Sequence, residues 1–203
     1  MSLYDKALAH PFIYDRLRPW VVGGIDMSPM FRLLDARTED IILDVGSGTG
    51  MALEYLPAVR QYHAFDTDSQ AIQYAMRRPE SKRDGVRYEN RQVGPEDFER
   101  IRPTRVILSG ILHHLPAEEA TTLLNLCGTC DSVIRVATCD NVFIPGALIN
   151  NLLCRFDRGD FVRTIEEHME LIRSTKLRFH DITITRSHSK KGRAIYVMTA
   201  LEP

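Results

Sequence analysis

The stretch IILDVGSGTG, residues Ile41 to Gly50, combines a strand-forming run, an acidic residue and a glycine at every second position. Glycine-rich turns that follow a first strand let backbone N–H groups come close to a bound ligand. The stretch therefore predicts the first strand and turn of an α/β domain, with a ligand bound at the turn.

Short apolar or β-branched runs alternate with stretches of helical period along the rest of the chain, which is typical of a parallel sheet flanked by helices. We expect a helix over 69–78 with Ser69 at its N-cap, and a helix over 116–126 that begins with a proline and two acids. Strands are expected at residues 41–45, 62–65, 86–90, 105–109, 132–137, 177–185 and 193–200.

The last two strands are separated only by RSHSKKG, which is too short for a crossover helix and therefore predicts an antiparallel hairpin. The predicted fold is α/β: a doubly wound, mostly parallel seven-stranded sheet that ends in this hairpin. A chain of 203 residues suits one domain over 1–203. We expect an N-terminal helical cap over 1–37, a cofactor-binding half over 38–140, and a cap insertion with the C-terminal hairpin over 141–203.

The composition indicates a soluble intracellular protein, expected in the cytoplasm. With 26 basic and 27 acidic residues the formal net charge is -1, which gives no field that would draw the chain to nucleic acid or to an anionic membrane. No run approaches the roughly 20 apolar residues of a membrane span, and the first residues lack the pattern of a signal peptide. Cys127 and Cys130 form a lone C-x-x-C without a second pair, so we expect no metal site.

The spacing of the glycines distinguishes two ligands. A dinucleotide fingerprint, G-x-G-x-x-G, would need its third glycine at position 51, where the chain has Met51; Gly50 gives G-x-G-x-G instead. Asp66 ends the second predicted strand, where a carboxylate can accept hydrogen bonds from both hydroxyls of a ribose. Both dinucleotides and S-adenosylmethionine contain that ribose, and the spacing favours the latter.

Three segments in order, LDVGSGTG, AFDTD and VILSGILHHLP, resemble motifs of the class I (Rossmann-like) S-adenosylmethionine-dependent methyltransferases. The resemblance covers about residues 38–140 by motif and extends to the C-terminus by topology, because that family ends in the same kind of hairpin. It implies S-adenosylmethionine as the cofactor, S-adenosylhomocysteine as its product, and methyl transfer as the activity.

The resemblance also implies the residues of the cofactor site. Asp44, Gly46, Ser47 and Gly48 are expected at the amino-acid part of the cofactor, Asp66 at the ribose, Gln92 and Val93 at the adenine, and Ser109 and Gly110 at the wall of the fourth strand; Thr67 is a further expected cofactor-binding residue. The chain departs from the family at the adenine, where an acidic residue is common; the Gln92 side-chain oxygen is the alternative acceptor for the adenine amino group.

His113 and His114, just beyond the fourth predicted strand, are the candidate catalytic residues, of which at most one is expected to act as a base. No acidic residue stands beside either histidine in the sequence. Methyl transfer from a sulfonium is an in-line displacement of an activated leaving group, so alignment of the acceptor can suffice. The alternative is that the pair packs the turn.

Candidate substrate residues lie in two segments outside the sheet. Tyr14 and Trp20 belong to the N-terminal segment, and Arg155 and Arg158 to a long insertion after the fifth strand. The arginines can meet a substrate carboxylate or form a solvated helix face. The apolar part of the insertion suits an apolar substrate or a second subunit, and hence a homodimer.

A small-molecule acceptor is favoured, because the fourth-strand segment lacks the Asn/Asp-Pro-Pro-aromatic tetrad of many nucleic-acid and protein amine methyltransferases. The alternative is a cofactor-binding protein of the same fold that is a regulatory subunit or catalyses another reaction.

Overall fold

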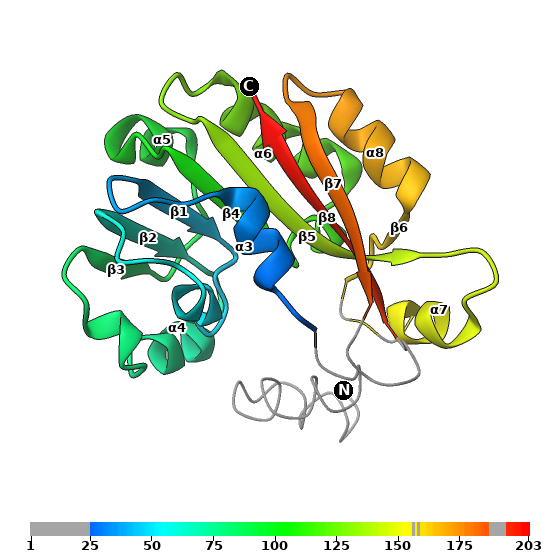
Figure 1. Ribbon diagram of the computed structural model, residues 1–203, viewed down its shortest axis with the longest axis horizontal. Helices are drawn as coiled ribbons and strands as arrows, with labels where there is room; N and C mark the ends of the chain where they lie inside the picture. Colours follow the sequence, from blue (N-terminus) through cyan, green and yellow to red (C-terminus); the bar gives the residue numbers. More distant parts are fainter. Residues whose placement is uncertain (1–24, 156, 158, 187–193) are drawn as a thin grey trace.

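The computed structural model describes residues 25–155, 157, 159–186 and 194–203. They form one mixed sheet in the order β3-β2-β1-β4-β5-β8-β7, with the short strand β6 paired to β5 (Figure 1). The strands are β1 (Ile41–Val45), β2 (Gln61–Phe65), β3 (Val86–Glu89), β4 (Arg105–Ser109), β5 (Arg135–Phe143), β6 (Arg163–Thr164), β7 (Arg178–Arg186) and β8 (Ile195–Glu202).

The first five strands pair in parallel, and β8 pairs antiparallel with both β5 and β7. The predicted α/β class, mostly parallel sheet and terminal hairpin are therefore confirmed. Since β1 lies between β2 and β4, the chain leaves β1 toward one side of the sheet and later returns to its other side. Ligands of doubly wound sheets bind at such a switch point, outside the carboxyl ends of the strands.

Helices cover both faces of the sheet. The helices are α3 (Ser28–Leu34), α4 (Ser69–Ala75), α5 (Pro95–Ile101), α6 (Ala117–Thr129), α7 (Leu148–Arg155) and α8 (Ile165–Arg173), and the 3₁₀ turns are η1 (Met51–Glu54), η2 (Glu80–Lys82) and η3 (Leu112–His114). Side chains of α5, α6 and α8 pack on one face, in a cluster that includes Phe98, Leu124 and Ile172. On the opposite face, Met30 and Leu34 of α3 pack with Leu53 of η1, and α3 crosses the sheet in Figure 1.

The strand β5 differs most from its prediction, because it runs over Arg135–Phe143 and not over 132–137. Its second half contains Asp140 and Asn141, a polar pair that predicts a loop. Pairing with Val197 and Tyr196 of β8 keeps both residues in the strand, and both are buried. The extra strand β6 contains only two residues, too few for a period-2 pattern.

Two helix starts test the capping predictions. Asp68, and not Ser69, is the N-cap of α4: its Oδ1 accepts hydrogen bonds from the backbone N–H groups of Gln70 and Ala71. Asp and Ser are about equally good caps, so the sequence alone did not separate the two neighbours. The predicted start of α6 is confirmed, with Pro116 at the N-cap and Glu118 and Glu119 in the first turn.

The expected cap insertion after β5 consists of α7, a connecting segment and β6. The predicted turn at 187–193 and the first 24 residues of the N-terminal cap lie outside the described residues. Within the described part of the chain, no helix has both the length and the apolar character needed to cross a membrane.

Candidate active site

A cleft of about 1420 Å³ opens at the carboxyl ends of β1, β2 and β4, where the sheet order reverses. The structure brings every predicted cofactor residue to this cleft. They are Asp44, Gly46, Ser47, Gly48, Asp66, Thr67, Gln92, Val93, Ser109 and Gly110.

The glycine loop after β1 holds a left-handed backbone at the cleft. Gly48 has φ +53°, and a Cβ built there would meet no atom of the described residues within 4 Å, so among these residues it would point into open space of the cleft. Gly50 has φ +74°, but a Cβ there would lie 2.8 Å from the Tyr88 hydroxyl oxygen. Gly50 is therefore required by packing, whereas Gly48 leaves room for a ligand.

Asp66, at the end of β2, is oriented by the backbone. Its Oδ2 accepts a hydrogen bond from the Gly48 N–H at 2.7 Å, and its Oδ1 accepts one from the Asp68 N–H at 2.8 Å. Asp68 caps α4, so Asp66 is free of the capping role that a lone aspartate after a strand often has. Each carboxylate oxygen keeps further lone-pair capacity, so Asp66 can accept two more hydrogen bonds from a ligand.

Asp44, at the end of β1, is a buried carboxyl that accepts a hydrogen bond from the Tyr62 hydroxyl. Burial, together with the smaller effect of the negative charge of Asp66, raises its pKa to about 7, against the effect of the Tyr62 hydrogen bond. In the following loop, the buried Ser47 Oγ has no hydrogen-bond partner among the described residues. Both residues line the cleft, where a polar ligand could form hydrogen bonds with them.

The far end of the cleft is formed by the loop after β3. Gln92 is exposed there, and Val93 packs against the core. The preceding Arg91 lies over the Phe65 ring, 4.9 Å from its centroid, and pairs with Asp97 at 2.6 Å. Arg91 therefore fixes the loop that carries Gln92.

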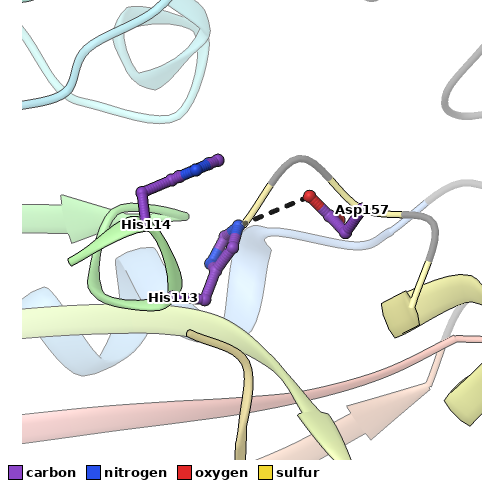
Figure 2. A group of neighbouring side chains, drawn as sticks. All are labelled: His113, His114 and Asp157. Atoms are coloured by element: carbon purple, nitrogen blue, oxygen red, sulfur yellow. Dashed lines mark ion pairs between the residues drawn. The ribbon is translucent and has the colours of Figure 1, made fainter. Parts of the chain in front are cut away.

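His113 and His114 form the turn η3, directly after β4 (Figure 2). His113 is buried: its Nδ1 lies 2.8 Å from Oδ1 of Asp140, and its Nε2 lies 3.6 Å from Oδ1 of Asp157. Burial alone would lower the pKa of His113, but the carboxylates of Asp140 and Asp157 outweigh it and raise the pKa to about 9. His114 is exposed, and its ring centroid lies 4.3 Å from that of His113.

Neither of these two acids is near the histidines in the sequence. Asp140 is 27 residues from His113. It reaches His113 because β5 extends beyond β4, whose last residue Ser109 pairs with Cys139. Asp157 comes from the insertion after α7. The signals that could have identified the two acids are the polar pair Asp140–Asn141 after an apolar run and the Asp157-x-Gly159 turn.

The insertion is attached to η3 by backbone contacts. A Cβ on Gly159 would lie 2.2 Å from Cδ2 of His113, so only glycine lets the chain pass the imidazole this closely. The Phe161 N–H donates to the His113 carbonyl at 3.0 Å, and Arg163 donates to the carbonyls of Leu112 and Leu115 at 2.7 and 2.8 Å. These bonds hold Asp157 beside the histidines.

The part of the cleft beyond the glycine loop is mainly apolar. Phe31 and Tyr55 stack there with ring centroids 4.8 Å apart. The other described residues of this recess include Ile25, Met27, Met51, Cys139 and Tyr196. Of the predicted substrate residues, Arg155 ends α7 as an exposed side chain and is not among the described residues that line the cleft. Tyr14, Trp20 and Arg158 lie outside the described residues.

Comparisons with known proteins agree with the motifs. Residues 42–130 match the model of a methyltransferase domain. A search of curated proteins found no match. Among solved structures, human N-acetylserotonin methyltransferase in complex with S-adenosylmethionine is 17% identical, with a TM-score of 0.62 over 87% of this chain and 51% of that chain.

Two bacterial proteins of known structure also resemble this chain in fold at low sequence identity. An N-methyltransferase from Bradyrhizobium japonicum, in complex with S-adenosyl-L-homocysteine, is 10% identical, with a TM-score of 0.63 over 86% of this chain and 84% of that one. An O-methyltransferase family 2 protein from Planctomyces limnophilus, in complex with apigenin, is 17% identical, with a TM-score of 0.63 over 98% of this chain and 62% of that one.

The matched domain and the shared fold define the class of protein. Residues 42–130 match a methyltransferase-domain model, and the described residues share the fold of class I, S-adenosylmethionine-dependent methyltransferases, in agreement with the three motifs. Identities of 10% to 17% show the fold alone, and the chain spans only 51% and 62% of the human and Planctomyces proteins. The acceptor and the role of each site residue are therefore matters of proposal.

Proposed function

We propose that this protein transfers a methyl group from S-adenosylmethionine to a small-molecule acceptor. One observation carries the proposal: a single cleft is lined by the glycine loop and Asp66, by a group of apolar residues and by the two histidines. Its volume of about 1420 Å³ exceeds the roughly 300–1,000 Å³ of an ordinary ligand pocket. The cleft therefore has room for a cofactor and an acceptor side by side.

The residues of the loop fit the cofactor. Asp66 would accept the two ribose hydroxyls, because its carboxylate is already oriented by two backbone N–H groups. Gly48 would let the cofactor approach the backbone, and Ser47 Oγ would gain the partner that it lacks within the described residues. Asp44 would place a carboxylate near the positive amino-acid end. When bound, the cofactor supplies a methyl group on a sulfonium, which is already activated for displacement.

The element after the loop argues against a dinucleotide. A pyrophosphate is normally held at the N-terminus of a helix, where the aligned peptide dipoles favour negative charge. Here the loop leads into η1, a 3₁₀ turn of four residues with Glu54 in its first turn. A short turn with an acid offers little to an anion, whereas it leaves a cationic cofactor undisturbed.

The lining of the cleft supports a small acceptor. Among the described lining residues, Arg91 is the only lysine or arginine, and it is paired with Asp97 and Glu89. The other cationic side chain among these residues is the buried His113, which lies between Asp140 and Asp157, so a phosphate backbone would find little to pair with. The recess formed by Phe31, Tyr55 and their neighbours suits an apolar or aromatic acceptor. N-Acetylserotonin and apigenin, which appear in the names of two similar structures, are small molecules of this kind.

Catalysis would depend mainly on proximity and orientation. The cleft would align the acceptor with the methyl group, and the apolar walls would exclude water. His113 and His114 border the space where the acceptor would lie, and we assign them to orienting it. A cytoplasmic location and a homodimer remain predictions; the exposed Leu148, Ile149 and Leu152 of α7 are the surface that would suit a second subunit.

The test is acceptor-dependent formation of S-adenosylhomocysteine. Purified protein is incubated with S-adenosylmethionine and a panel of phenols, amines and thiols, beside protein and RNA fractions, and the product is measured by mass spectrometry. We expect product with a small molecule. Product only with protein or RNA would contradict the small-molecule assignment, and cofactor binding without any product would favour a protein that binds the cofactor and does not transfer the methyl group.

A further inference from the structure

Three potential metal ligands meet at the edge of the cleft (Figure 2). One ligand atom from each of His113, His114 and Asp157 lies within 4.8 Å of the other two. Zinc binds nitrogen and carboxylate oxygen at about 2.0–2.2 Å, which places neighbouring ligands of a tetrahedral ion about 3.4 Å apart. The 3.6 Å between His113 Nε2 and Asp157 Oδ1 already approaches that spacing. The widest pair would close by at most about 1.4 Å.

The buried His113 nitrogen that faces this cluster has no hydrogen-bond partner. The His113 side chain is 3% exposed, and its Nε2 has no hydrogen-bond acceptor or donor within the described part of the chain. A buried polar atom of this kind is rare in proteins without a ligand or water to satisfy it. The separation of 3.6 Å from Asp157 is longer than a hydrogen bond, so this acid does not satisfy the nitrogen in that way.

Two of the three candidate ligands are held by hydrogen bonds with neighbouring side chains, as metal ligands usually are. His113 can donate its Nδ1–H to Asp140 at 2.8 Å, so that an ion which displaces the proton on Nε2 would find the lone pair of this nitrogen directed at the cluster. Asn141 donates its Nδ2–H to the other oxygen of Asp157 at 3.1 Å. Metal-binding histidines and carboxylates are usually fixed by such outer hydrogen bonds. Two consecutive residues of β5 thus orient two of the three candidate ligands.

We propose that His113, His114 and Asp157 bind a divalent transition-metal ion, with Zn²⁺ as the ion that the ligand set fits. Two imidazoles and one carboxylate are a usual set for zinc sites that keep one position open. Mg²⁺ and Ca²⁺ prefer oxygen ligands and would bind poorly. The two cysteines that led us to expect no metal are not involved.

The position gives the ion a use beyond the proposed function. His113 and His114 line the cleft beside Gly110, so an open coordination position would face the acceptor recess. An oxygen or nitrogen of the acceptor could occupy that position and be oriented by the ion. The proposal concerns binding of the ion, however, and its test uses neither cofactor nor acceptor, so it can fail or succeed independently of methyl transfer.

The test is zinc binding to the full-length, untagged protein after treatment with a chelator. Zn²⁺ is titrated in competition with a chromophoric chelator, and Co²⁺ is titrated as a spectroscopic probe. We expect one Zn²⁺ per chain, no comparable binding of Mg²⁺, and visible cobalt bands without a thiolate charge-transfer band. Binding of no ion, or equal binding of Mg²⁺, would overturn the proposal. A thiolate band would assign the ion to cysteines and would overturn it too.

Two variants test the ligands, and two test specificity. His114→Ala and Asp157→Asn change side chains that are not deeply buried, and each should weaken Zn²⁺ binding by more than the roughly 10–100-fold expected from an outer-shell change. The matched controls are His180→Ala and Asp181→Asn, exposed residues of β7, which should change nothing. Melting temperatures without metal verify that each variant is folded. Unchanged zinc affinity in folded His114→Ala and Asp157→Asn would show that the cluster is an ordinary ion pair.

Discussion

At the scale of single residues, the grouping of the predicted residues in one cleft could be expected from the sequence, whereas the acids beside His113 could not. The residues assigned to the cofactor stand at strand ends or in the turns that follow them, and parallel strands bring those ends together, so local motifs are enough to predict one cleft. Asp140 and Asp157 meet His113 through the length of β5 and the path of an insertion, and neither is encoded near the histidines. The roles of all these residues remain proposals.

Asp44 offers the first residue-scale prediction. Burial raises its pKa in the folded protein to about 7, above the ordinary value of 3.8, so the protonated form is favoured by folding. The stabilisation of the folded protein that comes from the protonated Asp44 is complete below about pH 3.8, and it is lost as the pH rises toward 7. Asp44→Asn still accepts the Tyr62 hydrogen bond without carrying a charge. The stability of the variant relative to wild type should therefore rise between pH 5 and pH 8, by at most about 3 kcal/mol.

Urea unfolding of both proteins at pH 5 and pH 8 measures this difference. A stability difference that does not change with pH would contradict the raised pKa of Asp44. We also expect Asp44→Asn to bind S-adenosylmethionine more weakly, because the carboxylate would no longer face the positive end of the cofactor. A buried acid that reduces stability near neutral pH is consistent with a residue kept for its ligand.

Asp66 offers the second prediction, with Asp68 as its neighbour for comparison. Asp66→Asn replaces charge-assisted hydrogen bonds with neutral ones, which differ by about 1–2 kcal/mol, so S-adenosylhomocysteine affinity should fall by about tenfold or more. Asp68→Asn removes a charge two residues away and preserves the cap of α4, because Asn caps as well as Asp. Calorimetric titration with S-adenosylhomocysteine compares the affinities of the two variants. Equal losses would indicate a general charge effect and would contradict a specific ribose contact.

At the scale of elements, the sequence predicts the strands that contain a short, mainly apolar run and fails where a strand continues through consecutive polar residues. The strands β1, β2 and β4 begin and end within a residue of their predicted bounds, because each is a buried run that stops at a polar or glycine residue. The second half of β5 was missed because its buried Asp140 and Asn141 are held by long-range pairing with β8. The intrinsic strand propensities of Asp and Asn do not predict this long-range pairing.

The glycine loop gives an element-scale prediction. Gly48→Ala and Gly50→Ala both force alanine into a left-handed backbone, at a cost of roughly 1–2 kcal/mol each. Only at Gly50 does the new methyl group also meet the Tyr88 hydroxyl and the Ala75 Cβ, at 2.8 and 3.0 Å. Gly50→Ala should therefore unfold at lower denaturant than Gly48→Ala.

Cofactor affinity should separate the same two variants in a second way. The methyl group of Gly48→Ala points into open space of the cleft, so this variant should stay the more stable one and yet lose affinity for S-adenosylhomocysteine. Denaturation midpoints and calorimetric titrations on both proteins give the comparison. A Gly48→Ala protein that binds as tightly as wild type would show that the ligand does not approach the loop there.

At the scale of the whole molecule, the sheet order places all the candidate chemistry at one edge. The reversal between β2-β1 and β4-β5 opens the cleft, the glycine loop and Asp66 border one part of it, and η3 borders the other. Motif order and the terminal hairpin were enough to predict this architecture. The acceptor was beyond prediction, because the recess is formed by side chains from α3, η1, β5 and β8, which are far apart in the sequence.

The most direct test of the central claim, that the cleft binds S-adenosylmethionine, is thermal unfolding with S-adenosylmethionine, S-adenosylhomocysteine or NAD. A ligand that binds only the folded state adds about 2.7 kcal/mol at a hundredfold excess over its dissociation constant, which raises the melting temperature of a chain of this size by several degrees. We predict such a shift with both sulfur compounds and none with NAD. A comparable shift with NAD, and none with either sulfur compound, would contradict the assignment.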